Sequence, residues 1–242
     1  MWRFRLILER IDAGANDCFF CFIHKFKNCY APMKNPPPYG LTAKYWDNLS
    51  PRSQELYRTV SPLPDAVYTV DWHLGQLEQT LAGIEKSMVD MGGSFDLNPD
   101  FQRGHVWTVA QQVAFVESML RNVTTGRILF NCPGWAHTPA APGDIPEHTF
   151  VILDGLQRLT AVRRFMDDAF AVFGGLRASD LRGSPFDPFR NSYRLQIGIF
   201  EFNTRQDLLS HYLAINNGGT VHSQEEIQRV QGLLVRATPS EN

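Results

Sequence analysis

The sequence lacks any apolar run near the roughly 20 residues that a membrane-spanning helix requires. Its first residues alternate arginine with apolar side chains and have no signal-peptide core. Only four cysteines occur among the 242 residues, too few to suggest a secreted disulfide scaffold. These absences predict a soluble, cytoplasmic protein with reduced cysteines.

The chain also lacks a large charge of either sign, since 23 Lys and Arg residues stand against 25 Asp and Glu residues. The formal net charge of −2 excludes a nucleic-acid binder that is strongly basic overall, but it does not exclude a local basic patch. No internal repeat is visible. The hydrophobic content of 43% is that of an ordinary globular protein.

The first part of the chain differs from the rest and is rich in aromatic residues and cysteine. Zinc sites usually combine two well-spaced pairs of ligands, and this part holds only one Cys-x-x-Cys pair, which argues against a zinc site. The candidate ligands are Cys18, Cys21, His24 and Cys29.

Three prolines at 36–38 break regular structure. Because Met33 lies just before them, we expect that residues 1–32 could be an over-extended gene start. We predict an irregular extension over residues 1–65 and one folded domain over residues 66–236.

Hydrophobic periodicity from about Val67 onward predicts alternating strands and helices, hence an α/β (α+β) domain. The proline-rich loop 132–148 is longer than usual and could be a lid or an insertion. Capping boxes are expected at Thr108 with Gln111 and at Ser223 with Glu226. We expect strands at 67–70, 95–97, 127–130, 150–153 and 193–199, and helices at 74–88, 108–120, 156–165, 208–215 and from 223.

The segment 149–164 reads as a buried strand, an Asp154-Gly155 turn and an amphipathic helix. The first turn of a helix has unpaired backbone N–H groups and partial positive charge. Gln157 and Arg158 add donors there, so the turn suits an anion, most naturally phosphate. The alternative is an ordinary turn, with Asp154 capping the helix and Arg158 in a surface salt bridge.

Two further segments carry polar residues where a ligand could bind. Gln102 and Arg103 follow a short strand and precede a capped helix, and they could form a second polar wall or a surface salt bridge. His105 and Trp107 could stack on a base, although a tryptophan is more often core. At 217–219, Asn-Gly-Gly suits close backbone approach to a ligand, or only a turn.

Three motifs in order resemble one family. NPDFQRGHVW at 98–107, ILDGLQRLTA at 152–161 and INNGGTVHS at 215–223 are similar to signature segments of the N-terminal domain of GmrSD-type restriction endonucleases. Gly155, Arg158 and Ala161 also fit the G-x-x-R-x-x-A box of ParB/sulfiredoxin-like folds. The resemblance covers about residues 67–230.

This resemblance implies a ParB-like α/β domain, a small mixed sheet packed by helices, that binds and hydrolyses nucleoside triphosphates beside a nuclease that cuts modified DNA. The chain departs from the pattern at Leu156, where many relatives have glutamine, and no His-rich nuclease signature follows residue 222. We therefore expect a nucleotide-hydrolysing module of a DNA-restriction system that works with DNA and a partner nuclease chain. The alternative is a non-catalytic ParB-like DNA-binding or adaptor protein that is switched by nucleotide and encoded by a phage.

The expected roles follow from the motifs. Arg158 and Arg103 would grip the phosphates, because a guanidinium pairs two oxygens at once. Asp154 would hold Mg²⁺ or orient the attacking water, and Gln157 would orient water or contact phosphate. Further nucleotide contacts are expected from Gln102, Gly155, Asn217 and Gly219.

Overall fold

A computed structural model describes residues 41–102, 104, 106–123, 126–136, 142–190, 193–217 and 224–238. The chain divides into two compact units, Met1–Pro62 and Leu63–Asn242. The candidate zinc ligands near the N-terminus lie outside the described residues. Among the described residues, no helix is long and apolar enough to cross a membrane.

The first unit contains two short helices, α2 (Ala43–Asp47) and α3 (Pro51–Val60). Ser50 caps α3 by accepting the N–H of Ser53, and Pro51 occupies its first helical position. The Trp46 and Tyr57 rings meet edge to face, 6.2 Å apart. The prediction of irregular structure up to residue 65 is therefore wrong for these helices, because Ser-Pro here starts a helix instead of breaking one.

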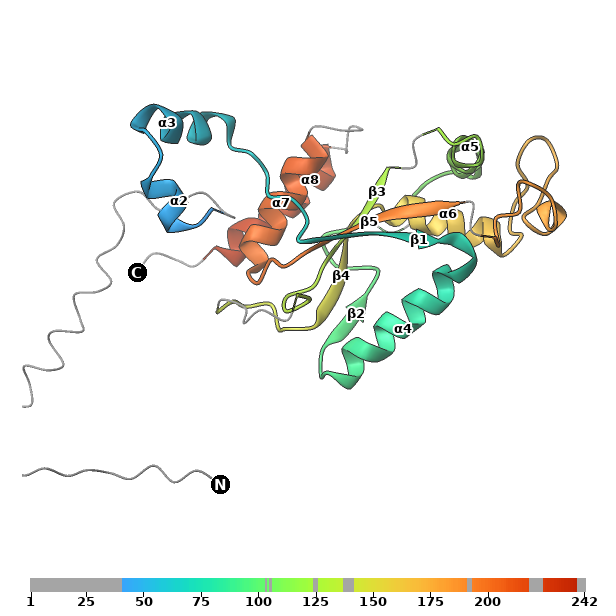
Figure 1. The fold of residues 1–242 in the computed structure, drawn as a ribbon, viewed down its shortest axis with the longest axis horizontal. Helices are drawn as coiled ribbons and strands as arrows, with labels where there is room; N and C mark the ends of the chain where they lie inside the picture. Colours follow the sequence, from blue (N-terminus) through green and yellow to red (C-terminus); the bar gives the residue numbers. More distant parts are fainter. Residues whose placement is uncertain are drawn as a thin grey trace, which may run out of the picture. The chain divides into compact units, whose positions relative to one another are not determined.

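The second unit is built on a five-stranded mixed sheet in the order β1-β5-β3-β4-β2, which confirms the predicted α/β class (Figure 1). Strand β2 runs parallel to β4, and β3 runs parallel to β5, whereas the β1–β5 and β3–β4 pairs are antiparallel. The strands are β1 (Tyr68–His73), β2 (Ser94–Asp96), β3 (Arg127–Asn131), β4 (Thr149–Asp154) and β5 (Arg194–Phe200).

Helices cover both faces of this sheet. Alternate residues of β4 point to opposite faces, so Phe150 and Ile152 belong to the core beneath α4, α5 and α6, while Val151 and Leu153 pack with α7 and α8. Figure 1 shows α7 and α8 together, apart from α4, α5 and α6. The helices are α4 (Leu77–Asp90), α5 (Val109–Leu120), α6 (Leu156–Met166), α7 (Arg205–Asn217) and α8 (Gln224–Ala237), with 3₁₀ turns at Leu74–Gln76 and Ser179–Leu181.

The predicted elements are present with shifted boundaries. The helix expected at 74–88 begins as a 3₁₀ turn, and the capping box of Thr108 and Gln111 is confirmed. The strand expected at 193–199 was predicted half-buried, but its second half is buried on both faces by the two helical layers. The box at Ser223 lies outside the described residues. In loop 132–148, the described residues form neither helix nor strand.

Candidate phosphate-binding turn

Three chain segments meet where β4 ends. Because β2 is parallel to β4, the chain leaves both strands at the same edge of the sheet. Because β3 is antiparallel to β4, its first residues also lie there, and Leu129 faces Asp154. In an α/β sheet, such an edge at the carboxyl ends of strands is where ligands usually bind.

Gly155 forms the turn between β4 and α6 and has a left-handed backbone with φ of 94°. A Cβ atom at this position would lie 3.0 Å from the Cα of Ile128, a backbone atom that cannot easily move. Glycine is therefore favoured for two reasons: it adopts the left-handed backbone easily, and it has no Cβ atom to collide with Ile128. The bond from the Leu159 N–H to the Gly155 carbonyl opens the helix, so the preceding N–H groups of the first turn have no partner in its ladder.

Arg158 lies on the first turn of α6 with its side chain 26% exposed. Its Nη2 donates to the Arg127 carbonyl at 2.7 Å and to Asp154 Oδ2 at 2.5 Å. Its Nε is buried without a hydrogen-bond partner, and Gly126 lies against this part of the side chain. A buried N–H of a charged group costs free energy when unpaired, so this donor marks a place that an anion could satisfy.

Asp154 pairs with Arg158 and does not cap α6, whose N-terminal residue has no side-chain cap. The alternative in which Asp154 caps the helix is therefore wrong. The salt bridge predicted as the alternative for Arg158 does exist, but it is partly buried and joins the two residues proposed to act together. The Oδ1 atom of Asp154 makes no hydrogen bond to another described residue.

Gln157 connects the turn to the segment after β2. Its Oε1 accepts the N–H groups of Val106 and Trp107 at 2.9 and 3.1 Å, and its Nε2 donates to the Gly104 carbonyl at 3.0 Å. These three bonds use most of the amide's capacity. In this structure Gln157 therefore holds the 104–107 segment in place, and contact with phosphate or water would require it to release these bonds.

Gln102 is also brought to the turn, because its Nε2 donates to the Leu153 carbonyl at 2.8 Å. Arg103 and His105 lie outside the described residues, but the flanking residues Gln102 and Gly104 both bond to the β4–α6 segment. Trp107 packs its ring against Phe115, 5.5 Å away, as a core residue does.

The Asn217-Gly219 segment is not placed at the site by the described residues. Asn217 ends α7, its side chain is not described, and Gly219 lies outside the described residues. Their nucleotide contacts stay predictions.

A second set of arginines holds the segment after β2, and the sequence patterns did not reveal it. Arg229 of α8 donates to the Asp100 carbonyl and, at 2.8 Å, to the Phe101 carbonyl. Arg205 of α7 pairs with the Asp100 carboxylate at 2.5 Å. The C-terminal helices thus fix the backbone next to Gln102. The sequence shows that the last two helices carry arginines, but it does not show which residues these arginines contact.

No cluster of three or more His, Cys, Asp or Glu side chains is found within the described part of the chain. Asp154 is the carboxylate that the turn itself supplies. A divalent ion here would take Asp154 and rely on phosphate oxygens and water for its other ligands, as Mg²⁺ often does.

The sequence matches the profile of the GmrSD restriction endonuclease N-terminal domain over residues 83–231. This region is more than half of the chain and contains all three motifs and the β4–α6 turn. No match was found among curated proteins or among solved structures, so the ParB-like label stays a prediction. The chain belongs to the family of the GmrSD restriction endonuclease N-terminal domain.

Proposed function

We propose that this chain binds a nucleoside triphosphate at the Asp154–Arg158 turn and hydrolyses it as part of a DNA-restriction system. Family membership gives the restriction-related, DNA-processing role. The observation that carries the nucleotide proposal is Arg158, held on the first turn of α6 with a buried, unpaired Nε. The same proposal includes the cytoplasm as the location of the protein.

Binding would use backbone and side chain together. The first N–H groups of α6 and the helix dipole favour phosphate at this end. Gly155 packs against Ile128 where a side chain would stand, so the start of α6 lies close to β3 and the Arg127 carbonyl. Asp154 and the Arg127 carbonyl orient the Arg158 guanidinium through Nη2, and under this proposal its remaining N–H groups bind the anion.

Hydrolysis would need an attacking water and neutralisation of the charge that develops on the γ-phosphoryl group. Oδ1 of Asp154 is the group in the turn suited to orient that water or to hold Mg²⁺ on the phosphates. Arg158, with Arg103 from the neighbouring segment, would stabilise the transferred oxygens. Gln157 would act as a positioning residue, because its amide binds the 104–107 segment.

A second candidate is a nucleotide-switched DNA-binding or adaptor protein without hydrolysis, and an origin in a phage belongs to this alternative. The observation in its favour is that Asp154 and Gln157 are both engaged in internal bonds. Under this alternative, phosphate bound at the same turn changes the affinity of the chain for DNA or for a partner nuclease.

Release of inorganic phosphate from each nucleoside triphosphate, with and without DNA, tests the proposal. We expect Mg²⁺-dependent release that stops when EDTA removes the metal and that Asp154→Asn abolishes. Arg163→Ala is the matched control, since Arg163 lies on the same helix but pairs with Glu78. Binding without release in the unmodified chain would favour the switch, and neither binding nor release would favour the adaptor.

A further inference from the structure

Residues 100–102 connect the C-terminal helices to the phosphate-binding turn. The side chain of Phe101 is buried, and its ring centre lies 5.3 Å from that of Tyr212 on α7. The side chain of Gln102 reaches the end of β4 instead, where its Nε2 donates to the Leu153 carbonyl at 2.8 Å. This short segment is thus anchored at one residue to the helical layer and at the next residue to the strand that leads into the turn.

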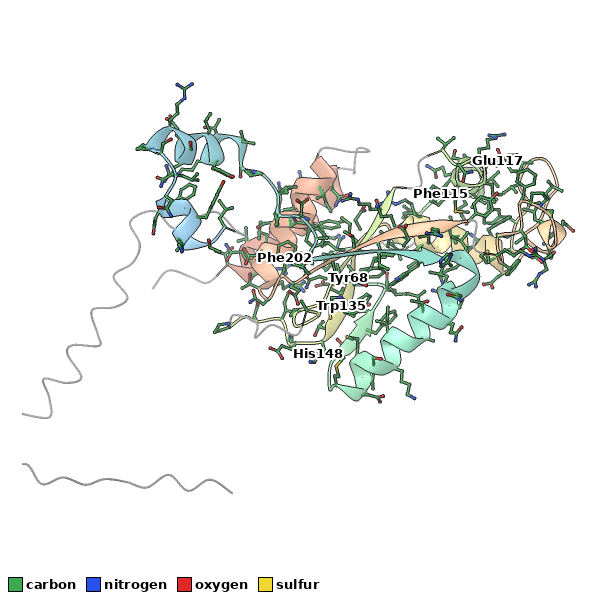
Figure 2. All side chains as sticks on the ribbon, viewed as in Figure 1. Tyr68, Phe115, Glu117, Trp135, His148 and Phe202 are labelled. Carbon is green, nitrogen blue, oxygen red and sulfur yellow. The ribbon has the colours of Figure 1, made fainter. Side chains whose placement is uncertain are left out.

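Phe101 belongs to the apolar core that α7 and α8 form against the sheet. The same core contains Phe202, labelled in Figure 2, with Tyr212 of α7 and Val230 of α8. Val230 is fully buried, and a close-packed core leaves a helix little freedom to shift. The packing of α8 therefore sets the position from which the side chain of the preceding residue, Arg229, extends.

Arg229 binds the backbone of the 100–102 segment. Its Nη1 donates to the Asp100 carbonyl, and its Nη2 donates to the Phe101 carbonyl at 2.8 Å. A planar guanidinium presents both donors in a fixed fork, so these bonds fix two successive peptide groups. The second of these peptide groups includes the N–H of Gln102, which bonds to the Pro99 carbonyl at 3.0 Å. Arg229 thereby holds the peptide group from which Gln102 extends.

Arg205 adds a weaker contact from α7. Its guanidinium pairs with the Asp100 carboxylate at 2.5 Å, and the two side chains are 35% and 59% exposed. An ion pair this close to solvent contributes little stability. The charge-assisted bonds of Arg229, one of them partly buried, are therefore the stronger polar restraint that the C-terminal helices place on this segment.

The restrained segment lies next to the proposed phosphate site. Gln102 bonds to the residue before Asp154, and Gln157 on the first turn of α6 bonds to the backbone at 104, 106 and 107. Arg103, to which the sequence analysis assigns phosphate, follows Gln102 directly in the sequence. A site built from two segments binds its ligand only while both are in place, so its apparent affinity falls with the populated fraction of that arrangement.

We propose that Arg229 is a positioning residue. It holds residues 100–107 against the Asp154–Arg158 turn, and it thereby raises the affinity of the turn for nucleotide without touching the ligand. The effect on nucleotide rests on the proposed function above. The restraint on residues 100–107 concerns the protein alone and is measured without a ligand.

Hydrogen exchange of the full chain, followed by mass spectrometry without nucleotide, tests the restraint. Arg229→Met keeps an unbranched side chain and removes both bonds to the segment. The amides of residues 100–107 should then exchange at least about threefold faster, because the segment opens more often. Arg236→Met is the matched control, since Arg236 lies on the same helix but bonds to the Gly232 carbonyl within it. Exchange of residues 100–107 should not change in this control.

Calorimetric titration of nucleoside triphosphate with Mg²⁺ tests the effect on affinity. Arg229→Met should weaken binding about threefold to tenfold, because the site is complete less of the time. Arg229→Lys keeps the charge without the planar fork, so both its exchange and its affinity should fall between those of Arg229→Met and the unmodified chain. Leu81→Ala lowers stability from the core on the other face of the sheet and should bind nucleotide as the unmodified chain does.

The outcomes separate this proposal from the proposed function. Unchanged exchange at residues 100–107 in Arg229→Lys, which tests the restraint even if Arg229→Met fails to fold, would overturn the positioning role whatever the nucleotide does. Faster exchange with unchanged affinity would overturn it as well, and so would equal weakening of binding in Leu81→Ala. If the unmodified chain binds no nucleotide while exchange rises in the Arg229 variants alone, the proposed function is wrong and the restraint by Arg229 is supported.

Discussion

The backbone adopts positive φ angles on both sides of α6, on a glycine before the helix and on larger residues after it. At its start, the positive φ falls on Gly155, where it costs little, and polar groups surround the turn. Beyond its end, positive φ angles fall on Asp168 and Phe173, and the surroundings of Phe173 are apolar. The first end fits a glycine closely against β3, and the second keeps a large side chain exposed at a conformational cost.

The two ends also differ in their relation to the three sequence motifs. The start of α6 carries the DGxQR-type residues, and its contacts reach back to segments near Gln102 and Gly126. Beyond its end lies an apolar cavity lined by Leu120, Phe173 and Phe186, and the Phe173 N–H bonds to Glu117, which belongs to none of the three motifs. We therefore assign the nucleotide proposal to the first end.

The largest expected effect comes from Gly155→Ala. An alanine there must adopt φ near 94° and place its Cβ 3.0 Å from the Ile128 Cα. Conformational strain and overpacking together should lower the free energy of unfolding by roughly 2–5 kcal/mol. Thermal and denaturant unfolding measure this loss.

Gly83→Ala is the matched control, because Gly83 lies inside α4 and an added Cβ would meet nothing within 4 Å. It should raise the free energy of unfolding by about 0.5–1 kcal/mol, the usual gain of alanine over glycine in a helix. If both variants lose the same stability, the turn is not constrained as described.

A more local effect is expected in acid, at the second end alone. Hydrogen bonds from Ser179 hold the pKa of Asp168 below its ordinary value, and bonds from Gly183 do the same for the pKa of Asp187. A lowered pKa in the folded state stabilises the fold above the ordinary pKa, and this contribution is lost as the pH falls through the folded value. Segment 168–187 should therefore open in acid, below about pH 4.

Hydrogen exchange followed by mass spectrometry, corrected for intrinsic rates, measures that opening. Asp168→Asn should weaken protection of the segment at neutral pH and reduce its further loss in acid. Asp90→Asn, at the exposed end of α4, should change neither. Equal acid sensitivity in all three proteins would mean that these carboxylates do not hold the segment.

Local patterns predicted the first end well and the second end hardly at all. The strand, glycine turn and helix at 149–164 are encoded by adjacent residues, so periodicity and turn chemistry were sufficient. The glycine pair at 174–175 indicated only an irregular stretch. The apolar cavity lined by Leu120, Phe173 and Phe186 forms because two segments about 50 residues apart in sequence pack together, and no short pattern specifies such a pairing.

At the Asp154–Arg158 turn, the sequence did not reveal which residues the side chains bond to. The sequence placed Gln157 on the first turn of the helix, but it could not show that the Gln157 amide bonds to residues about 50 positions earlier. Arg229 reaches back even further, to the carbonyls before Gln102. In the N-terminal unit, an irregular extension was expected over residues 1–65, whereas Pro51 after Ser50 starts a helix.

The central claim is that nucleotide phosphates bind at the start of α6, and calorimetric titration of nucleoside triphosphate with Mg²⁺ tests it most directly. Arg158→Ala should weaken binding by about tenfold or more, equivalent to about 1.4 kcal/mol, because a charge-assisted contact is lost. Arg163→Ala, on the same helix, should bind as the unmodified chain does. Equal affinity in Arg158→Ala and the unmodified chain would contradict the claim.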